Sequence, residues 1–159
     1  PVAHSFPTRR SSDLENFGPY RGRQVVDLTP NADEEEVRPI ILFGGMNGGG
    51  KTTFMDAIRL AFYGQRAQCS TRGNLSYSDF LSQAVNRHSE NKTRIELAFE
   101  EILDNQLVVF RITRTWQKGD NKDTLSILVD NWPDRALTNT WDEYIENLLP
   151  LGISNLFLF

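Results

Sequence analysis

Residues 45–52 read Gly-Met-Asn-Gly-Gly-Gly-Lys-Thr, and this spacing of residue types can bind the phosphates of a nucleotide. The stretch fits a pattern of Gly, four free positions, and then Gly-Lys-Ser/Thr. A phosphate chain carries several negative charges, so it requires many donors that converge on it. Backbone N–H groups converge only where the chain curls tightly, and glycine reaches the positive φ angles of such a curl at no steric cost. The pattern therefore predicts a loop that holds nucleotide phosphates.

The side chains at the end of the pattern have separate expected roles. Lys51 would reach the β- and γ-phosphates as a point charge, which makes it the candidate catalytic residue. The Thr52 hydroxyl would ligate Mg²⁺, and the Thr53 hydroxyl would bond the α-phosphate. The ligands expected here are ATP and Mg²⁺. The residues expected to bind the nucleotide are Gly45, Asn47, Gly48, Gly49, Gly50, Lys51, Thr52 and Thr53.

Two elements must position this loop. The apolar residues 39–43 before it predict a short buried strand, and residues 51–63 after it predict a helix whose N-terminus points at the phosphates. Gly64 stands where a C-terminal cap belongs. The apolar face of the helix, at three- and four-residue spacing, consists of Phe54, Ile58, Ala61 and Phe62. A flexible glycine-rich loop with a solvated lysine is the alternative; it explains the glycines but not Lys-Thr at a helix start.

Length and composition narrow the class of protein. A chain of 159 residues suffices for one domain with a core, and its net charge of −4 argues against coating nucleic acid through bulk charge, although a local basic patch stays possible. The single cysteine, Cys69, excludes a disulfide within the chain and fits a reducing cytosol. The nearest histidine is His88, so we expect neither a metal site nor a nucleophile at Cys69. No run approaches the roughly 18 apolar residues of a membrane span, so we expect a cytoplasmic protein without a membrane partner.

Both ends of the chain are unusual. Residues 1–14 are polar, contain two prolines and have no period, and residues 6–14 resemble translated sequencing-adapter text. This segment is interpreted either as an assembly artefact in place of a native first strand or as an ordinary disordered tail. Residues 156–159, Leu-Phe-Leu-Phe, form a buried-strand pattern that stops within an element. We therefore expect residues 15–159 to be a fragment of a longer protein.

The remaining pattern changes from loop and helix to strands. Residues 25–28 predict a strand, residues 31–36 an acidic solvated turn, residues 65–76 a polar loop and residues 77–86 a short helix. Three segments then alternate with period two and predict an antiparallel meander with half-buried strands. Their apolar positions are Ile95, Leu97, Phe99, Val108, Phe110, Ile112, Leu125, Ile127 and Val129. The turns between them contain Asp104, Asn105 and Gly119.

Two further features complete this part of the chain. Arg111 and Arg114 could contact a nucleic-acid phosphate, but a solvated face with cross-strand pairs is favoured for both. Thr140 and Glu143 fit a capping box, which predicts a helix that follows Thr140 and packs Trp141 into the core.

These features together resemble the SMC/RecN-like ATPases with ABC-type heads. Small kinases and GTPases usually continue from the helix after such a loop into alternating parallel βα units, whereas an antiparallel meander follows here. The Gly-x-Asn-Gly-x-Gly-Lys-Thr form of the loop, residues 16–20 and residues 56–64 are similar to the N-terminal lobe of those heads. More narrowly, residues 15–22, the loop and residues 148–157 resemble the DNA sulfur modification family DndD. The resemblance covers about residues 15–159.

The resemblance implies an α/β fold of the P-loop NTPase class, ABC/SMC-head type, with the loop strand and helix followed by the meander. It implies an ATPase of the bacterial phosphorothioate system, in which sulfur replaces a non-bridging oxygen of the DNA backbone. The implied partners are DNA, a second copy across an ATP-sandwiched head dimer, and other DNA sulfur modification proteins. In such heads a partner's signature motif and a Walker B acidic pair complete hydrolysis. The chain contains neither of these and no coiled coil, so we expect it to bind nucleotide without turnover.

Three other functions stay open at this point. A DNA repair ATPase of the RecF/SMC type shares the site, and genomic neighbours would separate it from a sulfur modification protein. A small-molecule kinase needs a lid of arginines, for which Arg66 and Arg72 are the candidates, but the meander argues against it. A binding module without hydrolysis is disfavoured by the intact Lys51 and Thr52 pair.

Overall fold

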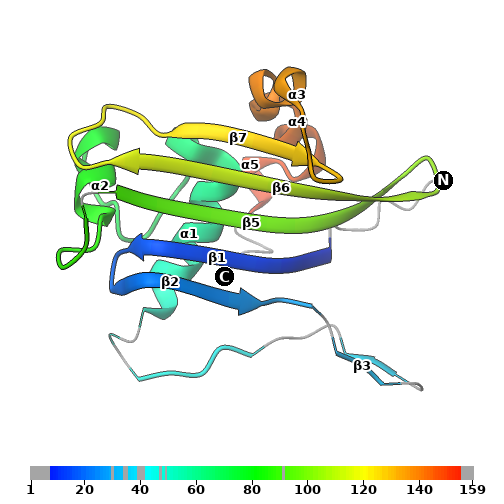
Figure 1. Cartoon of the computed structure of the whole chain (residues 1–159), viewed down its shortest axis with the longest axis horizontal. Helices are drawn as coiled ribbons and strands as arrows, with labels where there is room; N and C mark the ends of the chain where they lie inside the picture. The colour runs from blue at the N-terminus through cyan, green and yellow to red at the C-terminus, as the bar shows by residue number, and fades with distance from the viewer. Residues whose placement is uncertain are drawn as a thin grey trace.

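The computed structural model describes residues 8–29, 31–33, 36–38, 42–46, 48, 50–90 and 92–154. Its main feature is a six-stranded antiparallel sheet in the order β2-β1-β5-β6-β7-β8 (Figure 1). The strands of this sheet are β1 Thr8–Phe17, β2 Tyr20–Asp27, β5 Lys92–Leu103, β6 Gln106–Gln117, β7 Thr124–Val129 and β8 Trp132–Pro133. A separate hairpin consists of β3 Asn31–Asp33 and β4 Glu36–Arg38. The helices are α1 Lys51–Tyr63, the short 3₁₀ helix η1 Gly64–Arg66, α2 Tyr77–Ala84, α3 Arg135–Asn139, α4 Trp141–Leu148 and α5 Leu151–Ser154.

The predicted meander is confirmed. Strands β5 and β6 pair without a break from Lys92 opposite Gln117 to Leu103 opposite Gln106. The turn between them is formed by Asp104 and Asn105, with φ of 50° and 62°, and two successive positive φ angles match the right-handed twist of the strands they join. Strand β7 then pairs with β6, and β8 with β7, both antiparallel.

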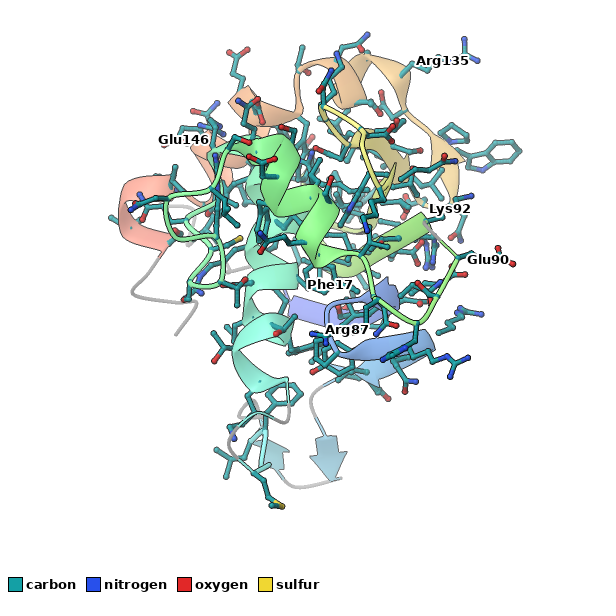
Figure 2. The ribbon with its side chains drawn as sticks, turned by 90° about the vertical axis from the view of Figure 1, so that its left-hand side faces the viewer. Phe17, Arg87, Glu90, Lys92, Arg135 and Glu146 are labelled. Atoms are coloured by element: carbon teal, nitrogen blue, oxygen red, sulfur yellow. The ribbon has the colours of Figure 1, made fainter. Side chains whose placement is uncertain are left out.

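Helix α1 is the element that links the sheet to the candidate site. It spans the predicted residues and ends at the predicted cap, Gly64, whose φ is 52°. Its apolar face packs on one face of the sheet, and Figure 2 shows the helical layer beside the edge-on sheet. The fully buried side chains of this interface include Ile58, Leu60, Phe62, Tyr63, Ile95, Leu97, Phe99 and Ile112. Burying several such side chains, each contributing about 1.5–3 kcal/mol, fixes the helix firmly on the sheet.

The structure contradicts the interpretation of residues 8–14 as part of a disordered tail. They lie in β1, which pairs with β2 on one side and β5 on the other. Leu14 is fully buried, and the buried Asp13 carboxylate accepts from Arg23 at 2.7 Å. Backbone hydrogen bonds to two neighbouring strands hold a segment in place even where its side chains are mostly polar, which is why the composition was misleading.

The strand predicted over residues 39–43 can be compared with the structure only at Leu42 and Phe43, because residues 39–41 lie outside the described part. At these two residues the prediction is wrong. Leu42 and Phe43 are in no strand and are 89% and 44% exposed. A strand requires a neighbour for its backbone groups, and among the described strands none pairs with this segment. The Phe43 ring instead packs at a tilt against Phe54 of α1, with ring centroids 4.9 Å apart and an angle of 44° between the ring planes.

The two arginines of β6 lie on opposite faces of the sheet, because their positions differ by an odd number. Arg111 is on the open face, where it forms an ion pair with Glu96, as predicted. The prediction of a solvated face is wrong for Arg114, which is buried beneath α1. Its guanidinium donates to the Ala61 carbonyl at 2.9 Å and to the Asp123 carboxylate at 2.7 Å.

Smaller differences concern the ends of elements. Part of the predicted acidic turn forms the β3–β4 hairpin, and the helix predicted over residues 77–86 ends at Ala84. Thr140 precedes α4 as predicted but does not cap it through its side chain. Its hydroxyl donates instead to the Ala136 carbonyl of α3, at 3.1 Å, the same carbonyl that accepts the Thr140 backbone N–H at 3.2 Å where α3 ends.

Cys69 provides a prediction about chemical reactivity. Burial raises the pKa of its thiol to about 12, above the ordinary value of 9.0. At about pH 8 the folded chain should therefore hold on the order of a thousandfold less thiolate than an ordinary thiol, and reaction with an aromatic disulfide reagent should be slowed at least as much. The rate is measured by absorbance, with the chain in concentrated guanidinium chloride as the control. Equal rates in both conditions would contradict the burial of this thiol.

The same shift has a consequence for stability. Because the folded pKa lies above the unfolded one, the unfolded chain ionises first as the pH rises. The stability that depends on the protonated thiol is fully present below about pH 9 and is lost between about pH 9 and 12. A Cys69→Ala variant should lose less thermal stability over that window than the parent chain.

Candidate nucleotide-binding site

A cavity of about 720 Å³ opens at the N-terminal end of α1. Three segments line it: the β1–β2 turn, the glycine-rich loop with the start of α1, and the end of α2 with the residues that follow. The lining residues are Gly18, Pro19, Gly48, Gly50, Lys51, Thr52, Thr53, Gln83, Val85, Asn86, Arg87 and His88. This volume is in the range of pockets that bind small organic ligands.

The structure brings most of the predicted residues to this cavity. Gly48, Gly50, Lys51, Thr52 and Thr53 all line it. Gly45 does not line it but is in contact with Lys51 through its carbonyl group. The remaining two predicted residues, Asn47 and Gly49, lie outside the described residues.

The described glycines of the loop differ in backbone conformation. Gly48 and Gly50 have φ of 84° and 89°, angles that only glycine adopts without strain. Gly45 does not use the left-handed region. Gly50 is also buried, and an added Cβ would lie 2.7 Å from the Tyr20 hydroxyl oxygen. Glycine is therefore required at position 50 by conformation and by space.

Lys51 is the cation that the loop itself contributes to the site. Its ammonium donates to the backbone carbonyls of Gly45 and Met46, the latter at 3.0 Å. An ammonium group has three N–H donors, so two of them hold the head group over the loop. The third can be directed at a phosphate oxygen, while the full positive charge attracts the anion.

Thr52 is the side chain that could contact a metal. It is exposed and lines the cavity next to Lys51. Among the described residues no group of three or more His, Cys, Asp or Glu could hold a metal ion. The donors present fit Mg²⁺ rather than a metal held by protein alone, because Mg²⁺ is commonly bound by one or two protein oxygens together with substrate phosphates and water.

The wall opposite the loop was not recognised in the sequence. Asn86 is buried and crosses to the β1–β2 turn: its side-chain amide donates to the Gly18 carbonyl at 2.7 Å, and its backbone N–H to the Asn16 carbonyl at 2.7 Å. Its side-chain oxygen accepts from the His88 backbone at 2.9 Å. The backbone bridge between Val85 and Phe17 also joins this segment to the end of β1, and Figure 2 labels Phe17 and Arg87 in the two segments.

These residues carry different signals in the sequence. The turn at residues 16–20 has a family resemblance but no pattern that indicates a pocket. Residues 85–88 follow the end of α2 in no regular pattern, and their role depends on a long-range contact, the bridge between Phe17 and Val85. Only the fold brings them to the cavity.

The two arginines considered for a kinase lid do not reach the loop. Arg66 lies beyond the C-terminal end of α1 and pairs with Glu146 at 2.9 Å. Arg72 lies over the Tyr77 ring, with its guanidinium carbon 5.4 Å from the ring centroid. Arg72 also donates to the Gln65 carbonyl at 2.8 Å, just beyond the C-terminal end of α1. A helix of this length separates its ends by about 18–20 Å, so both guanidinium groups are far from Lys51 at the other end. No helix in the described part of the chain is long and apolar enough to cross a membrane.

Comparison with known proteins gives the family context of this site. A family model for the AAA domain matches residues 13–159. The SbcC component of the nuclease SbcCD from Vibrio cholerae is 31% identical over 87 residues, which is 55% of this chain and 8% of that protein. The SbcC component of the same nuclease from Treponema pallidum is 44% identical over 52 residues, 33% of this chain and 4% of that protein. The chain thus spans less than a tenth of the length of either relative in these matches.

Proposed function

The chain belongs to the AAA domain family, and from this premise we propose that residues 15–159 form the ATP-binding N-terminal lobe of an ATPase head of the ABC/SMC type. The observation that supports this most directly is the cavity at the start of α1, where the loop glycines, Lys51 and Thr52 meet. The antiparallel meander beside α1 fits this type of head better than it fits a small kinase, because the sheet of small kinases is parallel. Residues 8–14 lie in β1 between β2 and β5, so the sheet of the proposed lobe includes them.

The roles of the residues follow from charge and position. The N-terminus of α1 adds partial positive charge at the bottom of the cavity, where the phosphates would lie. Lys51 would neutralise charge on the β- and γ-phosphates, and the Thr52 hydroxyl would contact Mg²⁺ bound with them. Mg²⁺ supplies charge neutralisation of the phosphates when it is bound. Arg87 and His88, which also line the cavity, would add further donors.

For the complete protein we propose an ATPase that acts with DNA, dimerises through its heads and works in DNA phosphorothioation with other sulfur modification proteins. The support for the finer assignment is the sequence resemblance at residues 15–22 and 148–157 to DndD. Hydrolysis is proposed to need acidic and signature residues from another lobe and a second copy, so the present chain alone would bind ATP without turning it over.

A DNA repair ATPase of the RecF/SMC type is the second candidate. It is favoured by the names of the two relatives, each a component of a nuclease. The geometry of the phosphate loop fits both candidates equally, because they differ in what ATP binding drives and not in how ATP is held.

One experiment separates these candidates. Cells carry the complete gene as wild type, as a deletion or as Lys51→Ala, and their digested DNA is analysed by mass spectrometry for phosphorothioate linkages, while survival after induced strand breaks is measured in parallel. If the protein acts in sulfur modification, the deletion strain and the Lys51→Ala strain should both lose the phosphorothioate linkages, and their survival should be unchanged. Loss of survival with unchanged linkages would replace the first candidate by the second. No change in either measurement would reject both.

A further inference from the structure

The glycine that joins the loop to α1 is held from outside the loop. The Gly50 carbonyl accepts the first backbone hydrogen bond of α1, from Phe54 at 2.8 Å. It also accepts a second bond, from the Tyr20 hydroxyl at 2.9 Å. Gly50 immediately precedes Lys51, so its orientation sets the direction in which the loop enters the helix. A side chain from another element therefore acts on the backbone at the most constrained point of the site.

The contact between Tyr20 and Gly50 is made by packing as well as by the hydrogen bond. A Cβ at Gly50 would be 2.7 Å from the Tyr20 hydroxyl oxygen and 2.9 Å from the ring carbon that carries it. The ring thus occupies the space that any other residue at position 50 would need. The hydroxyl is a hydrogen donor at neutral pH because the ordinary tyrosine pKa is already 10.0, and burial raises the pKa of Tyr20 further.

Tyr20 itself is fixed by the turn that precedes it. It is the first residue of β2 and pairs with Phe17 across the β1–β2 turn. Within that turn Gly18 donates to the Ala84 carbonyl at 2.6 Å and accepts from the Asn86 side chain at 2.7 Å. A Cβ at Gly18 would also lie 2.7 Å from the Thr53 methyl carbon. The turn is therefore clamped between the end of α2 and the first turn of α1.

From this arrangement we propose that Tyr20 is a positioning residue for the phosphate-binding loop, and that its hydroxyl orients Gly50 so that the loop is preorganised before an anionic phosphate chain binds. The inference rests on the proposed nucleotide site. Ordering this junction in advance lowers the entropy that binding must otherwise remove. Without the hydroxyl, the ring still fills its space, but the Gly50 carbonyl loses one of its two donors and the junction is less restrained.

The test compares the chain as wild type with Tyr20→Phe and with Tyr144→Phe. Tyr144 is a matched control because its hydroxyl also donates a hydrogen bond, to Glu101 at 2.6 Å, away from the cavity. Binding of ATP and of inorganic tripolyphosphate, each with Mg²⁺, is measured by calorimetry, and thermal unfolding is recorded without ligand. Tripolyphosphate has no base or sugar, so its affinity depends on the phosphate contacts alone. An effect on those contacts should therefore appear with both ligands.

We expect Tyr20→Phe to weaken both ligands by about 3- to 10-fold, as for the loss of one hydrogen bond, and Tyr144→Phe to change either by less than about twofold. Unaltered affinity in Tyr20→Phe would overturn the proposal. So would an equal loss in Tyr144→Phe, or a Tyr20→Phe chain that does not fold, since the hydroxyl would then act on overall stability. If the wild type binds neither ligand, the proposed nucleotide site itself fails, which is a distinct outcome.

Discussion

Alanine in place of Lys51 is expected to weaken ATP binding by about 10- to 100-fold while the chain stays folded. The expected loss corresponds to charged hydrogen bonds, which contribute about 1.5–3 kcal/mol each. Lys51 is positioned for this role by the first turn of α1, and its ammonium already lies over the loop carbonyls of Gly45 and Met46. Those carbonyls are on exposed residues, so water can replace the lysine there at little cost in stability.

The measurement is a titration of ATP with Mg²⁺, followed by thermal unfolding of the same samples. Lys122→Ala is the matched control: it removes the same charge from an exposed position in the β6–β7 connection and should leave both values unchanged. Binding by Lys51→Ala at wild-type affinity would remove Lys51 from the site. Loss of the folded state would mean that the lysine is structural. ATP turnover by the wild-type chain alone, absent in Lys51→Ala, would contradict the proposal that another lobe is needed for hydrolysis.

The parts of the fold that could be predicted are those governed by local periodicity. Helix α1 begins and ends where the apolar spacing and Gly64 placed it, because a three-to-four-residue repeat and a C-terminal glycine act over a few residues. The meander was predictable for the same reason, since alternation and turn residues such as Asp104 specify strands and hairpins locally.

Errors arose where a distant partner decides the structure. Residues 8–14 lack an apolar pattern, yet they form a strand because β2 and β5 supply hydrogen bonds on both sides. Leu42 has the apolar character of a strand residue, but among the described strands none lies beside it and it is 89% exposed. Propensity and pattern describe what a segment can form, and pairing determines what it does form.

The candidate site likewise has one part that the sequence predicted and one part that only the structure shows. The motif identifies the phosphate end through Lys51 and Thr52, because a contiguous loop carries its own signature. The opposite wall, with Asn86 and Arg87, and the Tyr20 contact to Gly50 come from segments that meet only through the sheet. Pairwise contacts of this kind leave no regular spacing in a single sequence, so the structure is required to find them.

Methionine in place of Arg114 is expected to lower the free energy of unfolding by about 3–5 kcal/mol, the cost of removing one partner of a buried ion pair. The side chains of Arg114 and Asp123 are each 6% exposed, so the Asp123 carboxylate would stay buried without its cation. Tyr77 also donates to Asp123, and burial together with that carboxylate raises the pKa of Tyr77. A neutral hydroxyl donor cannot replace the charge of the guanidinium. The same substitution removes the donor to the Ala61 carbonyl, near the C-terminal end of α1.

Urea unfolding of the parent chain and the variant measures this difference. Arg66→Met is the matched control, because the Arg66 and Glu146 side chains are 37% and 44% exposed and such a surface pair contributes at most about 1 kcal/mol. The additional change Asp123→Asn in the Arg114→Met chain should restore part of the lost stability, since it removes the uncompensated charge. A loss below about 1 kcal/mol for Arg114→Met, or no recovery in the double variant, would show that the carboxylate is solvated or neutral. The predicted order follows mainly from burial: the two arginines form the same kind of ion pair, but their substitutions differ severalfold in effect because water screens one pair and is excluded from the other.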